Sequence, residues 1–379
     1  MAPRRPPPEL INDAIGEILL RLPPDEPECL FRASLVCRPW RRILTDAAFL
    51  RRYRRFHKTP PLLGLFFIGN DRVQTETLPR FVPTTSASPF PQPMMSCRPW
   101  VAIDCRHGRV LLQKMKGGRF IVWDPITGVR RELDHPCIPF ESFSLSLLCA
   151  VPGCDHLDCH GGPFLVVWVC TDDVEGTEGH LARACVYSSQ VGSWGTSVSV
   201  PIGLFDFMNQ SRAALAGDGV YFMLGTGDRI LEYNLVKHGL SVIDTPEANE
   251  KGFLIVPTED GLLGVAAIKG TSLYLWSRKV NAEGVEGWTQ YRVIELQPLL
   301  PDVKLLHEAI VIAFAEGVRA IFLDTSSGIC IIDLNSEQAR TVSEPGTHYV
   351  VVPFTSFYTL DCACGKLPLP AKTNESLAS

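Results

Sequence analysis

The chain has 379 residues, of which 46% are hydrophobic and 20% are charged, and its net charge is −5. This composition supports a large buried core and excludes global disorder, and the negative charge argues against general nucleic-acid binding. The apolar runs, such as residues 62–68 and 164–170, are too short to cross a bilayer.

The first residues predict a disordered tail over 1–8 and no secretory signal, because they hold four prolines, two arginines and no apolar run. The chain has 13 cysteines, an odd number, in apolar strand-like contexts. Without a secretory signal, this usage predicts reduced, buried thiols and a location in the cytoplasm, the nucleus or both. We expect no membrane partner.

Helical periodicity is confined to residues 9–58, where four short helices are expected. The first begins at Asn12 or Asp13 and stops at Pro23-Pro24. Its apolar residues recur at i, i+3, i+4 and i+7, namely Ile15, Ile18, Leu19 and Leu22. The others are expected over 28–36, from Pro39 onward, and over 47–56. A module of about 50 residues buries too little surface to stand alone comfortably, so an apolar face left over indicates a partner.

Two motifs carry a family resemblance, Glu17-Ile18-Leu19-Leu20-Arg21-Leu22-Pro23 and Ser34-Leu35-Val36-Cys37-Arg38-Pro39-Trp40-Arg41. Residues 10–40 resemble an F-box, and the extension over 46–57 resembles the variant common in grass F-box proteins. The family usually opens with Leu-Pro, whereas this chain has Leu10-Ile11. The resemblance implies docking on a Skp-type adaptor, and through it on the cullin and RING subunits of a ubiquitin ligase.

Carried over by position, the resemblance implies ten residues for the module's core and its adaptor contact. These are Leu10, Ile11, Ile15, Ile18, Leu19, Leu22, Pro23, Leu35, Val36 and Trp40. For any single residue, packing within the module is an equal alternative. The basic run over 51–58 has two readings, a nuclear-localisation or nucleic-acid patch and a solvated helix face. We favour the solvated face and expect no nucleic-acid partner.

Residues 59–365 predict an all-β body, with a mobile loop over 75–95 and a second disordered tail over 366–379. A two-part pattern recurs along it. The first part is a glycine turn leading into an apolar strand, at Gly108, Gly162, Gly219, Gly261 and Gly317. The second is a strand, a polar turn and another strand, over 120–133, 184–200, 230–243, 273–294 and 330–343. Repeats of this size predict four-stranded propeller blades, five or six in number, and residues 62–68 with 348–360 are suited to close the ring.

Within this body, Trp123-Asp124-Pro125-Ile126-Thr127-Gly128 resembles the signature hairpin of plant F-box-associated propeller domains. Pro125 suits the turn, Thr127 can bond the local backbone and Gly128 supplies a positive φ. Residues 331–335 and 231–235 look like weaker copies. The fold class is therefore a multidomain chain with a helical F-box followed by a β-propeller.

Cys154, His156, Cys159 and His160 form a candidate metal site, because soft ligands suit zinc. Structural zinc usually takes a second ligand pair well downstream, and that pair is missing, so we expect no metal and no cofactor. No nucleophile elbow, phosphate loop or zincin helix is present, so we expect no catalytic residues and a protein that is not an enzyme.

These patterns predict a substrate-recognition subunit of an SCF-type (Skp–cullin–F-box) E3 ubiquitin ligase. The F-box would bind the adaptor and the propeller would bind an unknown target protein. The alternative is a β-propeller protein or glycan-binding module without a ubiquitin-ligase role, in which the N-terminal helices serve only for packing.

Overall fold

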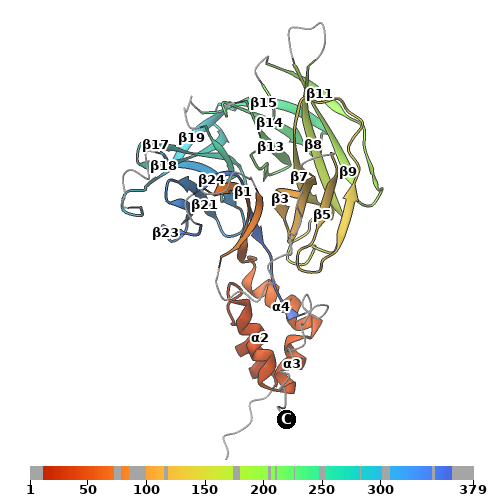
Figure 1. Cartoon of the computed structure of the whole chain (residues 1–379), viewed down its shortest axis with the longest axis vertical. Coiled ribbons are helices and arrows are strands. Elements are labelled where there is room, and N and C mark those ends of the chain that lie inside the picture. The colour runs from red at the N-terminus through yellow and green to blue at the C-terminus, as the bar shows by residue number, and fades with distance from the viewer. Residues whose placement is uncertain are drawn as a thin grey trace, which may run out of the picture.

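The structure, a computed structural model, describes residues 12–71, 78–84, 100–114, 118–173, 180–203, 206–209, 211–225, 227–246, 252–281, 283–300, 308–343 and 346–360. Four short helices form a module at one end, and six sheets form a β-propeller above it (Figure 1). The predicted fold class is confirmed, and the number of blades is six. The two predicted tails lie outside the described residues.

The helices are α1 (Asn12–Leu19), α2 (Pro27–Val36), α3 (Arg38–Leu44) and α4 (Ala47–His57). Proline lies in the first turn of α2 and of α3, where its missing N–H costs nothing. The Asp46 carboxylate caps α4 by accepting the Phe49 N–H at 2.9 Å. None of the described helices is both long and apolar enough to span a membrane.

The blades follow chain order except at the closure. Blade 1 contains β1 (Leu62–Asp71), β2 (Leu78–Pro83) and β24 (Gly346–Thr355). Blade 2 contains β3 (Trp100–Arg106), β4 (Arg109–Lys114), β5 (Phe120–Trp123) and β6 (Arg130–Leu133). Blade 3 contains β7 (Ser142–Cys149), β8 (Phe164–Asp173), β9 (His180–Ser188), β10 (Ser193–Trp194) and β11 (Val198–Ile202).

The remaining three blades have four consecutive strands each. Blade 4 contains β12 (Ala214–Ala216), β13 (Gly219–Leu224), β14 (Arg229–Asn234) and β15 (Gly239–Asp244). Blade 5 contains β16 (Leu254–Pro257), β17 (Leu263–Lys269), β18 (Ser272–Val280) and β19 (Glu286–Glu295). Blade 6 contains β20 (Ile310–Ala315), β21 (Ala320–Thr325), β22 (Gly328–Asp333) and β23 (Gln338–Thr341).

The two-part sequence pattern corresponds to fixed positions in the blades. The glycine-led strands are the second strands of blades 2–6, and the strand–turn–strand segments are the outer strands. The signature hairpin and its two weaker copies share one hydrogen-bond arrangement. Asp124, Asn234 and Asp333 each accept two backbone N–H groups of the following turn at 2.8–3.1 Å. Gly128 has a φ of 78°, as its turn requires.

The ring closes where the two ends of the propeller meet. Strand β1 pairs antiparallel with β24, for example Leu65 with Pro353, and β24 in turn contacts β3 and β20. This closure was predicted. The structure differs from the loop expected over 75–95, because residues 78–83 form β2 on the other edge of β1. Apart from Thr84, the rest of that range lies outside the described residues.

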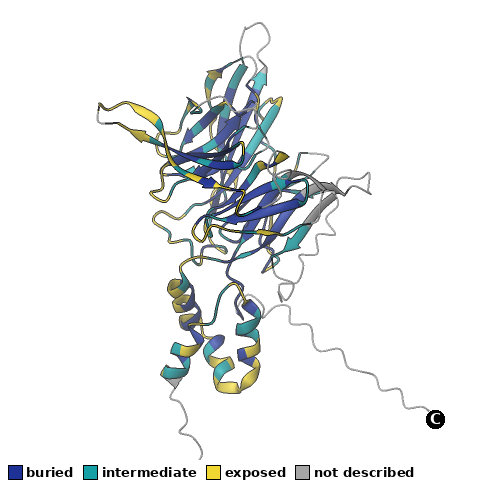
Figure 2. Cartoon of the chain, turned by 90° about the vertical axis from the view of Figure 1, so that its left-hand side faces the viewer, coloured by how far each residue is buried: buried dark blue, intermediate teal, exposed yellow. Residues whose placement is uncertain are grey.

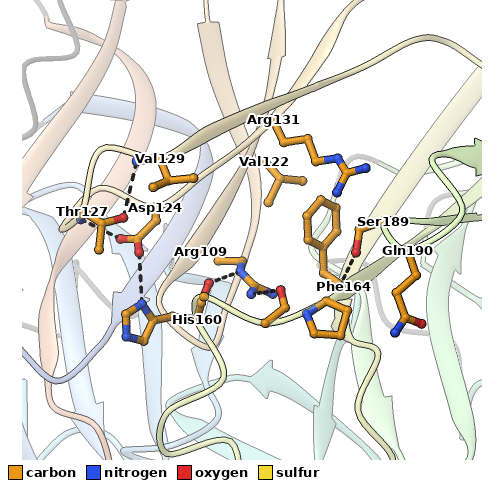
Figure 3. Close-up of a pocket in the computed structure, with 13 residues that line it drawn as sticks. Arg109, Val122, Asp124, Thr127, Val129, Arg131, His160, Phe164, Ser189 and Gln190 are labelled. Carbon is orange, nitrogen blue, oxygen red and sulfur yellow. Dashed lines mark hydrogen bonds and ion pairs between the residues drawn. The ribbon is translucent and has the colours of Figure 1, made fainter. Parts of the chain in front are cut away.

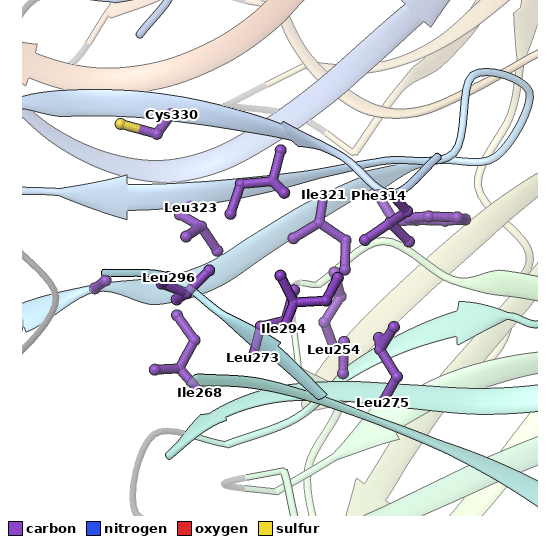
Figure 4. Close-up of a cluster of buried hydrophobic side chains, with 14 of the residues drawn as sticks. Leu254, Ile268, Leu273, Leu275, Ile294, Leu296, Phe314, Ile321, Leu323 and Cys330 are labelled. Carbon is purple, nitrogen blue, oxygen red and sulfur yellow. The ribbon is translucent and has the colours of Figure 1, made fainter. Parts of the chain in front are cut away.

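Apolar side chains fill the interfaces between neighbouring blades. Among the described residues, six clusters join each blade to the next, and the one between blades 5 and 6 includes Leu273, Ile294 and Ile321 (Figure 4). Burying one such side chain stabilises the fold by about 1.5–3 kcal/mol. Exposed residues gather on the helices and the outer hairpins, whereas the blade interiors are buried (Figure 2).

Candidate functional site

The helical module has a core of its own, and the end of the propeller completes it. Leu19, Leu44 and Tyr53 are at most 1% exposed, and the same cluster contains Phe357 and Leu360. The Tyr53 ring meets the Phe357 ring edge-on at 6.4 Å, and its hydroxyl donates to the Leu22 carbonyl at 2.8 Å. The chain after β24 therefore returns into the module, and the two parts share one core.

Of the ten residues predicted for adaptor contact, Leu10 and Ile11 lie outside the described residues, and the other eight divide into a packed group and an accessible group. Leu19 is buried in the core, while Ile15, Leu22 and Trp40 pack against that core and Pro23 is half-buried. Three residues remain accessible, and these are Ile18 at 50%, Leu35 at 81% and Val36 at 63% exposure.

The accessible residues Leu35 and Val36, called here the exposed apolar end, form the last turn of α2. Cys37 follows them as the N-cap residue of α3 and is also exposed. Next to it along the chain, α3 and the start of α4 line an open hollow with Arg38, Arg42 and Phe49 among its walls. Exposed aliphatic side chains on a module whose core is already filled are suited to a protein partner.

A second group of residues joins the module to the propeller. Residues 150–163, called here the junction loop, connect β7 to β8 in blade 3. Asp158 of this loop accepts from Arg54 of α4 at 2.9 Å, and Arg54 also donates to the Thr359 hydroxyl at 2.9 Å. Leu157 packs against the core of the module. The loop thus contacts α4 through both charge and apolar area.

Blade 2 holds the same loop from the other side (Figure 3). The Arg109 guanidinium donates to the backbone carbonyls of Cys159, His160 and Gly162, the first at 2.7 Å. The His160 ring lies 3.1 Å from the Asp124 carboxylate of the signature hairpin. Burial alone would raise the pKa of Asp124, but hydrogen bonds from His160 and Thr127 outweigh it and hold that pKa below its usual range.

These contacts border a pocket of about 430 Å³ between blades 2 and 3. Its walls combine apolar groups such as Val122 and Phe164 with Arg131 and Gln190 (Figure 3). Arg109, Asp124 and His160, also in the wall, are already engaged in holding the junction loop. The pocket suits binding, and its described residues contain no nucleophile paired with a base.

A buried charge network spans the middle of the ring. Asp104 of β3 is fully buried and accepts from Arg212 at 2.6 Å and from the Leu147 N–H at 2.8 Å. Arg106 contacts Asp104 at 3.4 Å, and one of its terminal guanidinium nitrogens donates to both carboxylate oxygens of Glu316 at 2.6 Å. Burial opposes ionisation of Asp104, but Arg106 and Arg212 outweigh it, so the pKa of Asp104 is lowered.

Sequence reasoning missed the residues that carry the junction. The basic run over 51–58 was expected to be a solvated face, which holds for the exposed Arg51, Arg52 and Arg55. Arg54 is the exception, since it is 3% exposed and bonded to two residues far along the chain. The only available signal was its position beside Tyr53 on the apolar side of the helix.

Comparisons with known proteins agree with this architecture. The family described as F-box domain matches residues 8–52, and the family described as F-box protein AT5G49610-like, beta-propeller, matches residues 101–358. No curated protein matches the chain.

Three solved structures illustrate a distant likeness. TolB from Acinetobacter baumannii is 10% identical, with 81% of this chain and 72% of that chain covered and a TM-score of 0.39. A nidogen/laminin complex is 10% identical over 77% and 98%, with a TM-score of 0.41. AztD from Citrobacter koseri is 10% identical over 76% and 97%, with a TM-score of 0.34. Likeness at this level carries no argument about function.

The match to the propeller family, over residues 101–358, covers more than half of the chain. The chain therefore belongs to the family of F-box proteins with an AT5G49610-like β-propeller.

Proposed function

We propose that this F-box protein is the substrate-recognition subunit of an SCF-type E3 ubiquitin ligase. F-box domains generally bind Skp-type adaptors in SCF complexes. The observation that carries the proposal is the exposed apolar end, because Leu35 and Val36 remain accessible although the module's core is filled. They are the residues through which we expect the adaptor, and beyond it the cullin and RING subunits, to be bound.

The subunit acts by proximity and is not itself an enzyme. The module anchors the chain, the propeller holds a target protein, and the ubiquitin-carrying enzyme is supplied by the rest of the complex, so the contribution is a raised effective concentration. The shared core and the Arg54–Asp158 pair support this role, because they restrict how far a bound target can move relative to the adaptor. We place this activity in the cytoplasm, the nucleus or both.

We assign target binding to the propeller face opposite the helices. The turn between β3 and β4, the junction loop and the end of β24 lie on the helical side, where Gly108 approaches Ser356. Because neighbouring strands are antiparallel, turns between the second and third strands of each blade lie on the other side. Among the described residues, the turns at 270–271 and 326–327 are of this kind, and we propose the face that carries them for target binding.

The test is the affinity of the full chain for a purified Skp-type adaptor. The double variant Leu35→Asp, Val36→Asp is expected to weaken binding about 30-fold or more, as loss of an interface hot spot does. The matched control is Val191→Asp, Val236→Asp, which places the same charges at exposed positions of the propeller, 77% and 70% accessible. The control should bind like wild type, and both variants should keep the wild-type thermal midpoint.

Two results would count against the proposal. Failure of the wild-type chain to bind any Skp-type adaptor would remove the ligase role and leave the alternative of a propeller binding module. Wild-type affinity in the Leu35, Val36 double variant would show that the adaptor binds elsewhere on the chain.

A further inference from the structure

The junction loop and the last residue of β7 bring four metal-ligating side chains together. The ligand atoms of Cys149, Cys154, His156 and Cys159 all lie within 4.8 Å of one another. The three cysteines carry free thiols. The sequence argues against zinc because a second ligand pair downstream is missing. The structure instead supplies one further ligand from upstream, Cys149 at the end of β7, and His160 is not in the set because its ring faces Asp124.

The distances match a tetrahedral zinc site after a small contraction. With zinc–sulfur bonds of about 2.3 Å, the sulfurs of a tetrahedral site lie about 3.8 Å apart, so side-chain shifts of about 1 Å suffice. The pair formed by Cys159 Sγ and His156 Nδ1 is already at 3.7 Å. The His107 ring stacks on the His156 ring at 3.9 Å, which restricts the orientation of the imidazole.

The backbone around the cluster is arranged to hold sulfur ligands. The Val151 N–H donates to Cys149 Sγ and the His156 N–H donates to Cys154 Sγ, each at 3.4 Å. Such donors to ligand atoms orient them and are a regular part of metal sites. Three thiolates and one Zn²⁺ leave a net charge of −1, and the Arg109 guanidinium lies beside the set, 2.7 Å from the Cys159 carbonyl.

The length and position of the loop suit such a crosslink. It runs for 14 residues between β7 and β8 without helix or strand, which is long for a compact domain. Its apolar residue Val151 is 40% exposed, and His156 adopts a positive φ of 57°. Apart from Leu157 and Cys159, the contacts described above that hold this loop are polar ones to blade 2 and to α4. Yet its Leu157 and Asp158 must meet α4 at defined positions.

We propose that Cys149, Cys154, His156 and Cys159 bind one structural Zn²⁺ that fixes the junction loop and so joins the propeller to the F-box module. Four protein ligands complete the tetrahedron, leaving no open position for a water or substrate. The role is therefore structural. The zinc proposal is independent of the adaptor proposal, since metal binding can be measured without the adaptor.

The first experiment measures metal in the full-length chain, purified from zinc-supplemented cells and dialysed against metal-free buffer. We expect about one zinc per chain by mass spectrometry of the metal. Removing a ligand should weaken zinc binding by at least the roughly 10–100-fold that loss of a supporting contact costs. The variants are Cys149→Ser, Cys154→Ser and His156→Asn, the last chosen because Asn tolerates positive φ. The matched control is Cys137→Ser, an exposed cysteine of the same region outside the cluster.

A second measurement uses only the wild-type chain, in case a variant does not fold. After the zinc is removed, Co²⁺ is titrated in, and we expect the intense visible absorption of tetrahedral cobalt with thiolate ligands, reversed by one equivalent of Zn²⁺. Removal of zinc should also speed amide exchange in residues 150–163 and in α4. Wild-type chain without zinc and without the cobalt spectrum would overturn the proposal. So would full zinc content in the Cys149→Ser and Cys154→Ser variants.

Discussion

The buried guanidinium of Arg54 lies 2.9 Å from the carboxylate of Asp158 and so ties α4 to a loop of the third blade, 104 positions along the chain. With Phe357 and Leu360 in the core of the helices, this pair makes the F-box module and the propeller one mechanical unit. The relative placement of adaptor and target is therefore set by side-chain packing as well as by the short connection from His57 to Leu62.

Replacing Arg54 tests this link. Arg54→Met keeps the apolar stem but removes the hydrogen bonds to Asp158 and Thr359, and we expect it to lower the free energy of unfolding by about 1–3 kcal/mol. The neighbouring Arg55→Met changes an exposed residue of the same type and should stay within about 0.5 kcal/mol. Denaturant unfolding followed by fluorescence measures both. Equal stability of the two variants would contradict a structural role for the pair.

The returning segment after β24 is expected to be necessary for the helices. Phe357→Ala removes a 6% exposed ring from the core of the module and should cost about 3–5 kcal/mol, with loss of adaptor binding. Phe56→Ala is the control, because that ring is 49% exposed. Circular dichroism and adaptor affinity are the measurements. A chain ending at Thr355 that kept its helices and its adaptor affinity would show that the module folds alone.

The central network predicts a pH dependence of stability. The pKa of Asp104 is lowered in the folded chain, so its contribution is present above the unfolded pKa of about 3.9 and is lost as pH falls through the folded value. Asp104→Asn leaves Arg212 and Arg106 without their buried carboxylate and should cost about 3–5 kcal/mol at pH 7.

Below about pH 4 the stability gap between wild type and Asp104→Asn should narrow, because wild type then loses the contribution that the variant already lacks. The exposed Asp218→Asn serves as the control and should follow the wild-type pH profile. Free energies of unfolding at several pH values below 5 check this. A gap that is constant with pH would argue against the lowered pKa.

The signature hairpin offers a comparison within one chain. Asp124 and Asp333 form the same turn, but only Asp124 also contacts His160 and so holds the junction loop. Asp124→Ala should therefore lower the free energy of unfolding by about 1–3 kcal/mol, and by more than Asp333→Ala lowers it. In a double-mutant cycle, His160→Ala should cost little once Asp124 is replaced. Additive losses would mean that His160 and Asp124 do not act together.

Local features of the sequence were sufficient for much of the architecture. Helix positions followed from proline and apolar spacing around Ile15 and Trp40, because capping and amphipathic patterns act over a few residues. The outer hairpins of blades 2–6 followed from glycine and polar turns such as that at Asp124, for the same reason. The repeated pattern indicated a propeller of five or six blades, since each blade repeats one local unit.

Tertiary structure decided what depends on residues far apart in the chain. The count of six blades required the pairing of β1 with β24, which forms only when the ring closes. The division of the predicted adaptor residues, with Leu19 buried and Leu35 exposed, depended on which faces the other helices and Phe357 cover. The meeting of Cys149 with Cys159, and of Arg54 with Asp158, depended on how the junction loop folds back between the blade and α4. Spacing along a chain does not encode such contacts, because many loop conformations share one spacing and only packing against the rest of the fold selects among them.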